Sequence, residues 1–255
     1  MIKTIGRATA ITALLLAQGT LASATDVKVF STVGVKSVLE ELIPKFEMST
    51  GHKIDVTWST AALLTKRVQA GEQVDALILI KDNVDALAKL GKIAPGSDTL
   101  FAQSIFAVGV KAGAPKPDIS SVEAFKNALL AAKTVSYTNP AAGGASGVYT
   151  AKQIERMGIT EQLKDKTKFP PAGGFTGTLL VSGEADIAIN SKPELMSVAG
   201  VDVVGPLPGD MAFTVVYDAA VQSGAAQPDA AKALVKFLMS PEAQAVFKAK
   251  GFDPI

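Results

Sequence analysis

The sequence contains no cysteine and a single histidine, His52. Without cysteine there is no disulfide bond, no thiolate metal ligand and no lipid-modified cysteine at a processing site. One histidine leaves little nitrogen for a zinc site, and a Ser–His–Asp triad would have to use a residue that we expect on the surface, in a turn at a helix end. We therefore expect no bound metal and no cofactor.

The sequence also lacks an excess of charge of either sign, because 25 lysine and arginine residues balance 24 aspartate and glutamate residues. No basic patch or tail stands out, so nothing predicts a nucleic acid partner. G-x-S-x-G and P-loop motifs are absent as well. What remains is an apolar-rich chain, 48% hydrophobic, that can bury a large core as one domain or as two lobes.

The first residues have the pattern of an export signal. Lys3 and Arg7 form a short basic start, residues 13–17 are apolar, and Ala22-Ser23-Ala24 has the small-x-small pattern of a cleavage site. Polar residues at 12 and 18–20 interrupt the apolar stretch, which is too short for a membrane-spanning helix. We predict that residues 1–24 are a signal peptide and that the remaining 231 residues are released into a periplasm, not embedded in a membrane.

Strand and helix patterns alternate along the first third of the chain. Apolar strands at 27–30, 53–58 and 76–80 are each followed by residues with helical periodicity. Pro44 falls inside the first helix and is expected to kink or divide it, while Asp82 or Asn83 is expected to cap the third. The alternation resumes after residue 134, with strands at 134–137 and 185–189 and helices at 147–157 and 176–181. This order favours an α/β fold with mostly parallel sheets flanked by helices.

Two segments break the alternation and divide the chain into lobes. Residues 101–110 are apolar with no helix after them, and Pro206-Leu207-Pro208-Gly209 is typical of a connection. We interpret them as the outward and return crossings between two lobes. Lobe 1 is then expected at 25–105 plus 206–255, and lobe 2 at 106–205.

Three segments resemble a known family. Ala70-Gly71-Glu72-Gln73-Val74-Asp75-Ala76-Leu77-Ile78 resembles the "AG…AD(V/L)" segment of type 2 periplasmic solute-binding proteins, and Gly183-Glu184-Ala185-Asp186-Ile187-Ala188-Ile189 resembles their second "GEAD" strand. Phe237-Leu238-Met239-Ser240-Pro241-Glu242-Ala243-Gln244 is similar to their C-terminal ending, with Ser240 as helix cap and Pro241 at the first helical position. The molybdate-binding branch is the one most similar. The resemblance covers nearly all of the chain after residue 24 and implies two lobes that close over a ligand, an ATP-binding-cassette (ABC) permease as partner, and a monomer.

Ligands of open α/β sheets bind beyond the carboxyl ends of the strands, where helices begin and their backbone N–H groups favour an anion. Four such junctions, at residues 31–34, 57–60, 143–147 and 173–176, are rich in hydroxyls and in glycines, which let a ligand approach the backbone. The alternative for each serine or threonine is that it only caps a helix. With the end of the strand at 185–189 added, the predicted ligand-binding residues are Ser31, Thr32, Gly34, Ser59, Thr60, Ser146, Gly147, Gly174, Phe175, Ser191 and Lys192.

The junctions depart from the molybdate pattern that the resemblance implies. The two lobe 1 serines of that branch would fall at Gly34 and Ala61, and its closing tyrosine near Ser191. We expect the lost side chains to enlarge the site for an organic carboxylate. The candidates for cations that bind this carboxylate are Lys36, Lys66, Arg67 and Lys192. The alternative for each is that it is an exposed side chain that is only solvated.

Two functions remain open. The first is a periplasmic protein that captures a small anion, an organic carboxylate rather than molybdate, for an ABC importer. The second is an enzyme similar to aconitate isomerase, on the same scaffold, that moves a proton between carbons of a tricarboxylate. Such an enzyme needs a group that carries the proton. Lys36, Lys192, Tyr149 and Glu194 are the candidates by residue type.

Overall fold

The computed structural model describes residues 25–142, 144–171 and 174–255. The predicted signal peptide lies outside these residues. Within them, no helix is long and apolar enough to cross a membrane.

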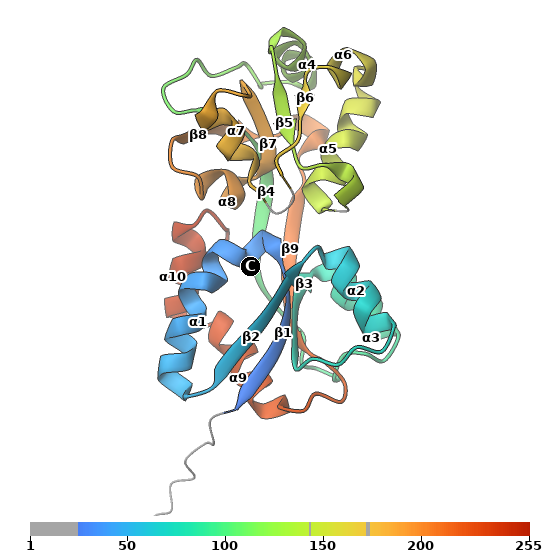
Figure 1. Ribbon diagram of the computed structural model, residues 1–255, viewed down its shortest axis with the longest axis vertical. Helices are drawn as coiled ribbons and strands as arrows, with labels where there is room; N and C mark the ends of the chain where they lie inside the picture. Colours follow the sequence, from blue (N-terminus) through green and yellow to red (C-terminus); the bar gives the residue numbers. More distant parts are fainter. Residues whose placement is uncertain (1–24, 143, 172–173) are drawn as a thin grey trace, which may run out of the picture.

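Lobe 1 is built on four neighbouring strands. β1 (Asp26–Thr32), β2 (Lys53–Ser59) and β3 (Ala76–Ile80) are parallel, in the order β2-β1-β3, and β9 (Thr214–Val221) joins β3 in antiparallel orientation. The helices flank this sheet (Figure 1), and they are α1 (Lys36–Thr50), α2 (Ala61–Gln69), α3 (Lys81–Lys89), α9 (Pro228–Leu238) and α10 (Pro241–Ala249). Apolar residues of α1, α9 and α10 belong to one core cluster, and those of α2 and α3 to another.

Strand β4 (Thr99–Lys111) passes from one lobe to the other. Its residues up to Ile105 pair with β9, whereas those from Phe106 onward pair with β7 (Ile187–Ser191) and β8 (Val201–Pro206). β4 and β9 are the two ribbons that run between the lobes in Figure 1. The two-lobed fold with two crossings is thereby confirmed, while the lobe boundaries at 105/106 and 205/206 stay a prediction.

Lobe 2 repeats the plan with shorter strands. β5 (Val135–Tyr137) lies between β6 (Thr167–Lys168) and β7 and is parallel to both. The helices of this lobe are α4 (Val122–Ala131), α5 (Ala145–Arg156), α6 (Thr160–Lys164), α7 (Thr176–Ser182) and α8 (Lys192–Met196). Short 3-10 turns at Val33–Val35, Pro140–Ala142 and Gly209–Met211 complete the chain.

Three local expectations have different outcomes. Pro44 lies inside an unbroken α1, whose buried face is fixed by packing of residues such as Leu42 and Phe46. Neither Asp82 nor Asn83 caps α3, because this helix begins earlier, at Lys81. Asn83 instead donates to the Thr65 hydroxyl at 2.8 Å. The cap at Ser240 is confirmed, since its hydroxyl accepts from the Ala243 N–H at 3.2 Å.

Candidate functional site

The carboxyl ends of the strands in both lobes meet near the crossing strands. In lobe 1 the register pairs Thr32 with Ser59, so the ends of β1 and β2 are adjacent. In lobe 2 Ser191, the last residue of β7, pairs with Phe106, the residue at which β4 changes partners. Figure 1 shows the starts of α1 and α2 on the side of lobe 1 that faces lobe 2. The predicted junctions therefore lie on the facing ends of the two lobes.

The lobe 1 junctions carry the predicted hydroxyls in different environments. Ser31 is buried, and its hydroxyl donates to the Thr32 carbonyl at 3.3 Å. Thr60 is the N-cap of α2 and accepts from the Leu63 N–H at 3.3 Å. Ser59 and Gly34 are partly exposed. Thr60 thus has the capping role that was its alternative, and Ser31 points into the protein.

The lobe 2 junctions converge on two residues that sequence analysis missed, Thr138 and Asn190. The Ser146 hydroxyl donates to the Thr138 hydroxyl at 3.2 Å, and the Asn190 amide donates to the same oxygen at 3.2 Å. Gly147 packs directly against the Thr138 carbonyl. The Asn190 amide also donates to the Thr176 hydroxyl at 3.2 Å. The starts of α5 and α7 and the end of β7 are therefore joined in one polar network.

Glu194, on α8, belongs to this network. One of its carboxylate oxygens accepts from the Thr176 N–H at 3.2 Å, from the Thr176 hydroxyl at 3.4 Å and from the Asn190 amide. Burial raises the pKa of Glu194 to about 7, against the opposing effect of these hydrogen bonds. A carboxyl with this pKa can both take and give a proton near neutral pH. The predicted residues Gly174 and Phe175 directly precede Thr176, and Phe175 makes no side-chain cap.

The expected enlargement of the site at Gly34 and Ala61 is wrong at Gly34. A Cβ atom at Gly34 would lie 2.8 Å from the hydroxyl of Tyr217, which comes from β9. The ring of Tyr217 thus fills the space that the missing side chain leaves. Ala61 is buried in the core cluster of α2 and α3.

The four candidate cations divide by their place on the helices. Lys36 and Lys192 are the first residues of α1 and α8, whereas Lys66 and Arg67 lie in the last turn of α2. Arg67 is paired with Glu72, with 2.7 Å between Nε and the carboxylate, and its guanidinium lies 4.4 Å from the Phe30 ring. A helix dipole disfavours a cation at the first position, so an anion placed nearby would offset that cost. The structure thus brings Lys36 and Lys192 to the junctions and leaves out Lys66 and Arg67.

Other titratable candidates face elsewhere. The Tyr149 hydroxyl donates to the Met211 carbonyl at 3.1 Å, and its ring stacks on that of Phe213, just before β9, with 4.5 Å between the ring centroids. Asp218 has a pKa raised to about 6, mainly by burial and also by Asp98 and Asp85. It follows Tyr217 in β9, and neighbouring residues of a strand point to opposite faces. His52 contacts Thr25 at the start of β1, at the opposite end of the sheet from the junctions.

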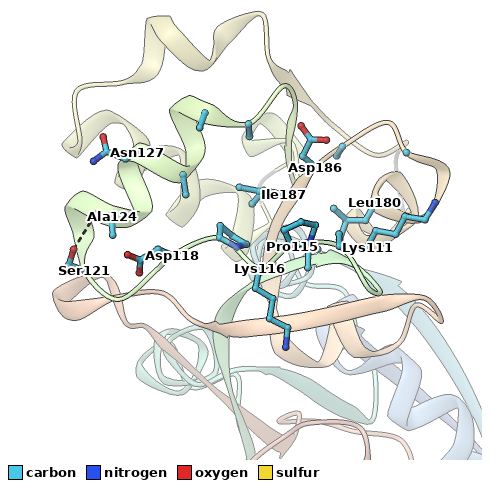
Figure 2. A pocket seen from close by; sticks show the side chains of 18 of the residues that line it. Lys111, Pro115, Lys116, Asp118, Ser121, Ala124, Asn127, Leu180, Asp186 and Ile187 are labelled. Atoms are coloured by element: carbon cyan, nitrogen blue, oxygen red, sulfur yellow. Dashed lines mark hydrogen bonds between the residues drawn. The ribbon is translucent and has the colours of Figure 1, made fainter.

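A cavity of about 1000 Å³ lies elsewhere on lobe 2, between the segment after β4, α4 and the turn before β7 (Figure 2). Its wall is mainly alanine, proline and aliphatic side chains. Lys111 at its rim donates to the Val181 carbonyl at 3.1 Å, and Asp186 accepts from the Lys133 N–H at 2.7 Å. None of the predicted ligand-binding residues lines it. The cavity therefore does not serve the anion site at the junctions.

Comparison with known proteins gives consistent matches along the chain. The family model described as bacterial extracellular solute-binding protein matches residues 27–253. The aconitate isomerase of a Pseudomonas species is 32% identical over 255 residues, covering 96% of this chain and 95% of that protein. The molybdate-binding protein ModA of Azotobacter vinelandii is 26% identical over 244 residues and covers 91% of each chain. The solved structure of the periplasmic molybdate-binding protein from the same organism superposes with a TM-score of 0.71 at 18% identity, covering 90% of this chain and 99% of that one.

Proposed function

We propose that this chain, which belongs to the bacterial extracellular solute-binding protein family, binds aconitate between its lobes in the periplasm. There it interconverts the cis and trans isomers by proton transfer. The observation that carries this proposal is Glu194, a carboxyl held at the junction network with a pKa of about 7. The similarity to an aconitate isomerase over almost the whole chain supports the choice of substrate.

The reaction needs a proton carrier and binding groups for three carboxylates. A base removes a proton from the methylene carbon of aconitate and returns one to the former vinyl carbon, so the double bond moves across the central carbon. Because the carbon skeleton is symmetric about that carbon, the product is again aconitate, and its geometry depends on how the carboxylate arms are held. No oxidant, reductant or leaving group takes part. One acid–base residue with a pKa near the working pH is suited to both steps.

We assign this role to Glu194. One of its oxygens is occupied by the donors of Thr176 and Asn190, which fix the carboxyl, and the other has no hydrogen bond within the described residues. Lys36 of lobe 1, whose ammonium lies 3.7 Å from a Glu40 carboxylate oxygen, and Lys192 of lobe 2 would supply positive charge at the starts of α1 and α8. Fixed cations and N–H groups stabilise the negative charge that develops when the methylene proton is removed.

Capture of a carboxylate for an ABC importer is the second candidate, and the family match favours it. Both functions use the same site and predict a monomer that binds a small anion. Position 34 has no hydroxyl of its own, so the serine expected there in the molybdate-binding pattern is absent.

The deciding experiment follows the purified mature chain with cis-aconitate by proton NMR. We expect trans-aconitate to accumulate until both isomers are at equilibrium, and we expect either isomer to raise the melting temperature. Stabilisation without turnover would support the transport function and refute the isomerase. If molybdate stabilised the protein more than any carboxylate, both proposed functions would name the wrong ligand.

Lys192 should matter for affinity in a way that Lys66 does not. Removing the charge with K192M leaves a substrate carboxylate without its point charge, and charge-assisted hydrogen bonds contribute about 1.5–3 kcal/mol. We expect the Kd for trans-aconitate, measured by calorimetry, to rise about 10- to 100-fold. K66M removes an exposed charge from the last turn of α2 and is the matched control, with an expected change below twofold. If both variants raised the Kd equally, only the net charge of the protein, and not the position of Lys192, would affect binding.

A further inference from the structure

Two buried hydroxyls lie on the strands that connect the lobes. Ser104 is on β4 and Tyr217 is on β9, and their exposed fractions are 0% and 3%. Their oxygens are 3.4 Å apart, which is long for a hydrogen bond between hydroxyls. Within the described residues, neither hydroxyl has another hydrogen-bond partner. A buried tyrosine usually satisfies its hydroxyl better than this.

Gly34 makes room for the Tyr217 hydroxyl. The φ angle of Gly34 is not positive, so any residue could adopt its backbone conformation. What prevents a side chain is the Tyr217 hydroxyl, 2.8 Å from the position of a Cβ atom, with the ring carbon Cε1 at 3.2 Å. Glycine is therefore required at position 34 because the Tyr217 hydroxyl lies too close for a Cβ atom. It holds the hydroxyl against the turn between β1 and α1, which is a ligand-facing junction in the proposed function.

The electrostatic surroundings connect this hydroxyl with Glu194 of lobe 2. Burial, with a smaller contribution from the charge of Glu194, raises the pKa of Tyr217 to about 12 against the opposing effect of the Ser104 hydrogen bond. The hydroxyl therefore keeps its proton at neutral pH and can act only as a neutral donor or acceptor. A neutral donor stabilises developing negative charge without first having to lose a proton.

We propose that the Tyr217 hydroxyl, held at Gly34 and backed by Ser104, donates a hydrogen bond to a carboxylate of the bound substrate. This inference rests on the proposed function, because it assigns a lobe 1 donor to the same site. When Glu194 takes the methylene proton, the electron pair delocalises into a substrate carboxylate. Tyr217 is the group that stabilises this charge, and no bond to Tyr217 forms or breaks.

The first test compares Y217F with Y149F in the isomerase assay. Removing the donor should lower kcat about 10- to 100-fold with little change in the melting temperature of the ligand-free protein, because the lost hydrogen bond is long. Y149F removes the bond to the Met211 carbonyl, so it should lower the melting temperature while kcat stays within twofold. Wild-type turnover by Y217F refutes the inference and leaves the proposed function intact. A wild-type chain that neither binds nor converts aconitate refutes both.

The second test separates packing from chemistry. G34A forces its new methyl group against the Tyr217 hydroxyl and should lower both the melting temperature and kcat. Adding Y217F removes the contact at 2.8 Å, so G34A/Y217F should recover most of the melting temperature but none of the turnover. Recovery of both would show that the hydroxyl has only a packing role. If Y217F does not fold, S104A decides, because loss of its support should lower kcat severalfold in a protein that melts like the wild type.

Discussion

Replacing Glu194 with glutamine is expected to abolish most turnover while the protein still folds and binds aconitate. Glutamine keeps an oxygen that can accept from Thr176 and Asn190, but it cannot carry the proton. General acid–base groups typically contribute about 10²- to 10⁴-fold, so kcat of E194Q should fall by that factor. E184Q is the matched control, because Glu184 is an exposed acid of the same lobe, beside Lys168 at 3.9 Å. Turnover of E194Q within threefold of the wild type would exclude Glu194 as the base.

The pH dependence of the wild type follows from the same group. The base acts in its ionised form, so kcat should rise with pH through about 7 and level off above it. The stability of the folded protein, unlike kcat, should fall as the pH rises. Because the folded-state pKa lies above the ordinary glutamate value of 4.5, ionisation opposes folding. The stabilising effect of the protonated form is complete below pH 4.5 and is lost as the pH rises through 7.

E194Q should therefore be more stable than the wild type at pH 8, by at most about 3 kcal/mol, and equally stable near pH 4. Urea unfolding at the two pH values measures this difference. A stability gain that does not depend on pH would mean that the carboxyl is not desolvated in the folded protein.

The sequence was sufficient for the parts of the fold that depend on local pattern. The repeated strand–helix units of lobe 1 were predicted from apolar periodicity, and the cap at Ser240 from its spacing to Pro241. β9 and α4 were missed. β9 is placed by antiparallel pairing with β3 and β4, which are distant in sequence, so no nearby residues indicate where it belongs.

In the candidate site, too, the features set by local sequence were predicted and those set by long-range contacts were not. The predicted ligand groups lie at strand-to-helix junctions, and a helix begins at or just after each of these junctions. Thr138, Asn190 and Tyr217 were not among the predicted residues, because their partners come from other elements. Asn190 was open to prediction, because it is a polar residue that ends a buried apolar run. The contact between Tyr217 and Gly34 depends on how β9 lies behind the start of α1, which neither residue indicates in the sequence.

The second large effect is expected for G147A, and its sign is the reverse of the usual one. Gly147 lies in the first turn of α5, where alanine normally favours the helix by about 0.5–1 kcal/mol. Here a Cβ atom would overlap the Thr138 carbonyl oxygen and lie 3.0 Å from its carbon and 3.2 Å from the carbonyl carbon of Asn139. All three atoms belong to the backbone, so no side chain can move aside. Overpacking of this kind costs about 1–3 kcal/mol, which exceeds the gain in helix propensity.

G144A is the matched control for this prediction. Gly144, the N-cap of α5, has φ −72° and ψ 138°, which alanine adopts readily. Among the described residues, its Cβ atom would meet only the Thr138 side chain, at 3.4 Å. We expect G144A to change the free energy of unfolding by less than about 1 kcal/mol. G147A should lose about 2 kcal/mol and also turnover, since a displaced Thr138 releases Asn190 and with it the donors that fix Glu194. If G147A were as stable and as active as G144A, the close packing of α5 on Thr138 would not be needed to hold Glu194 in place.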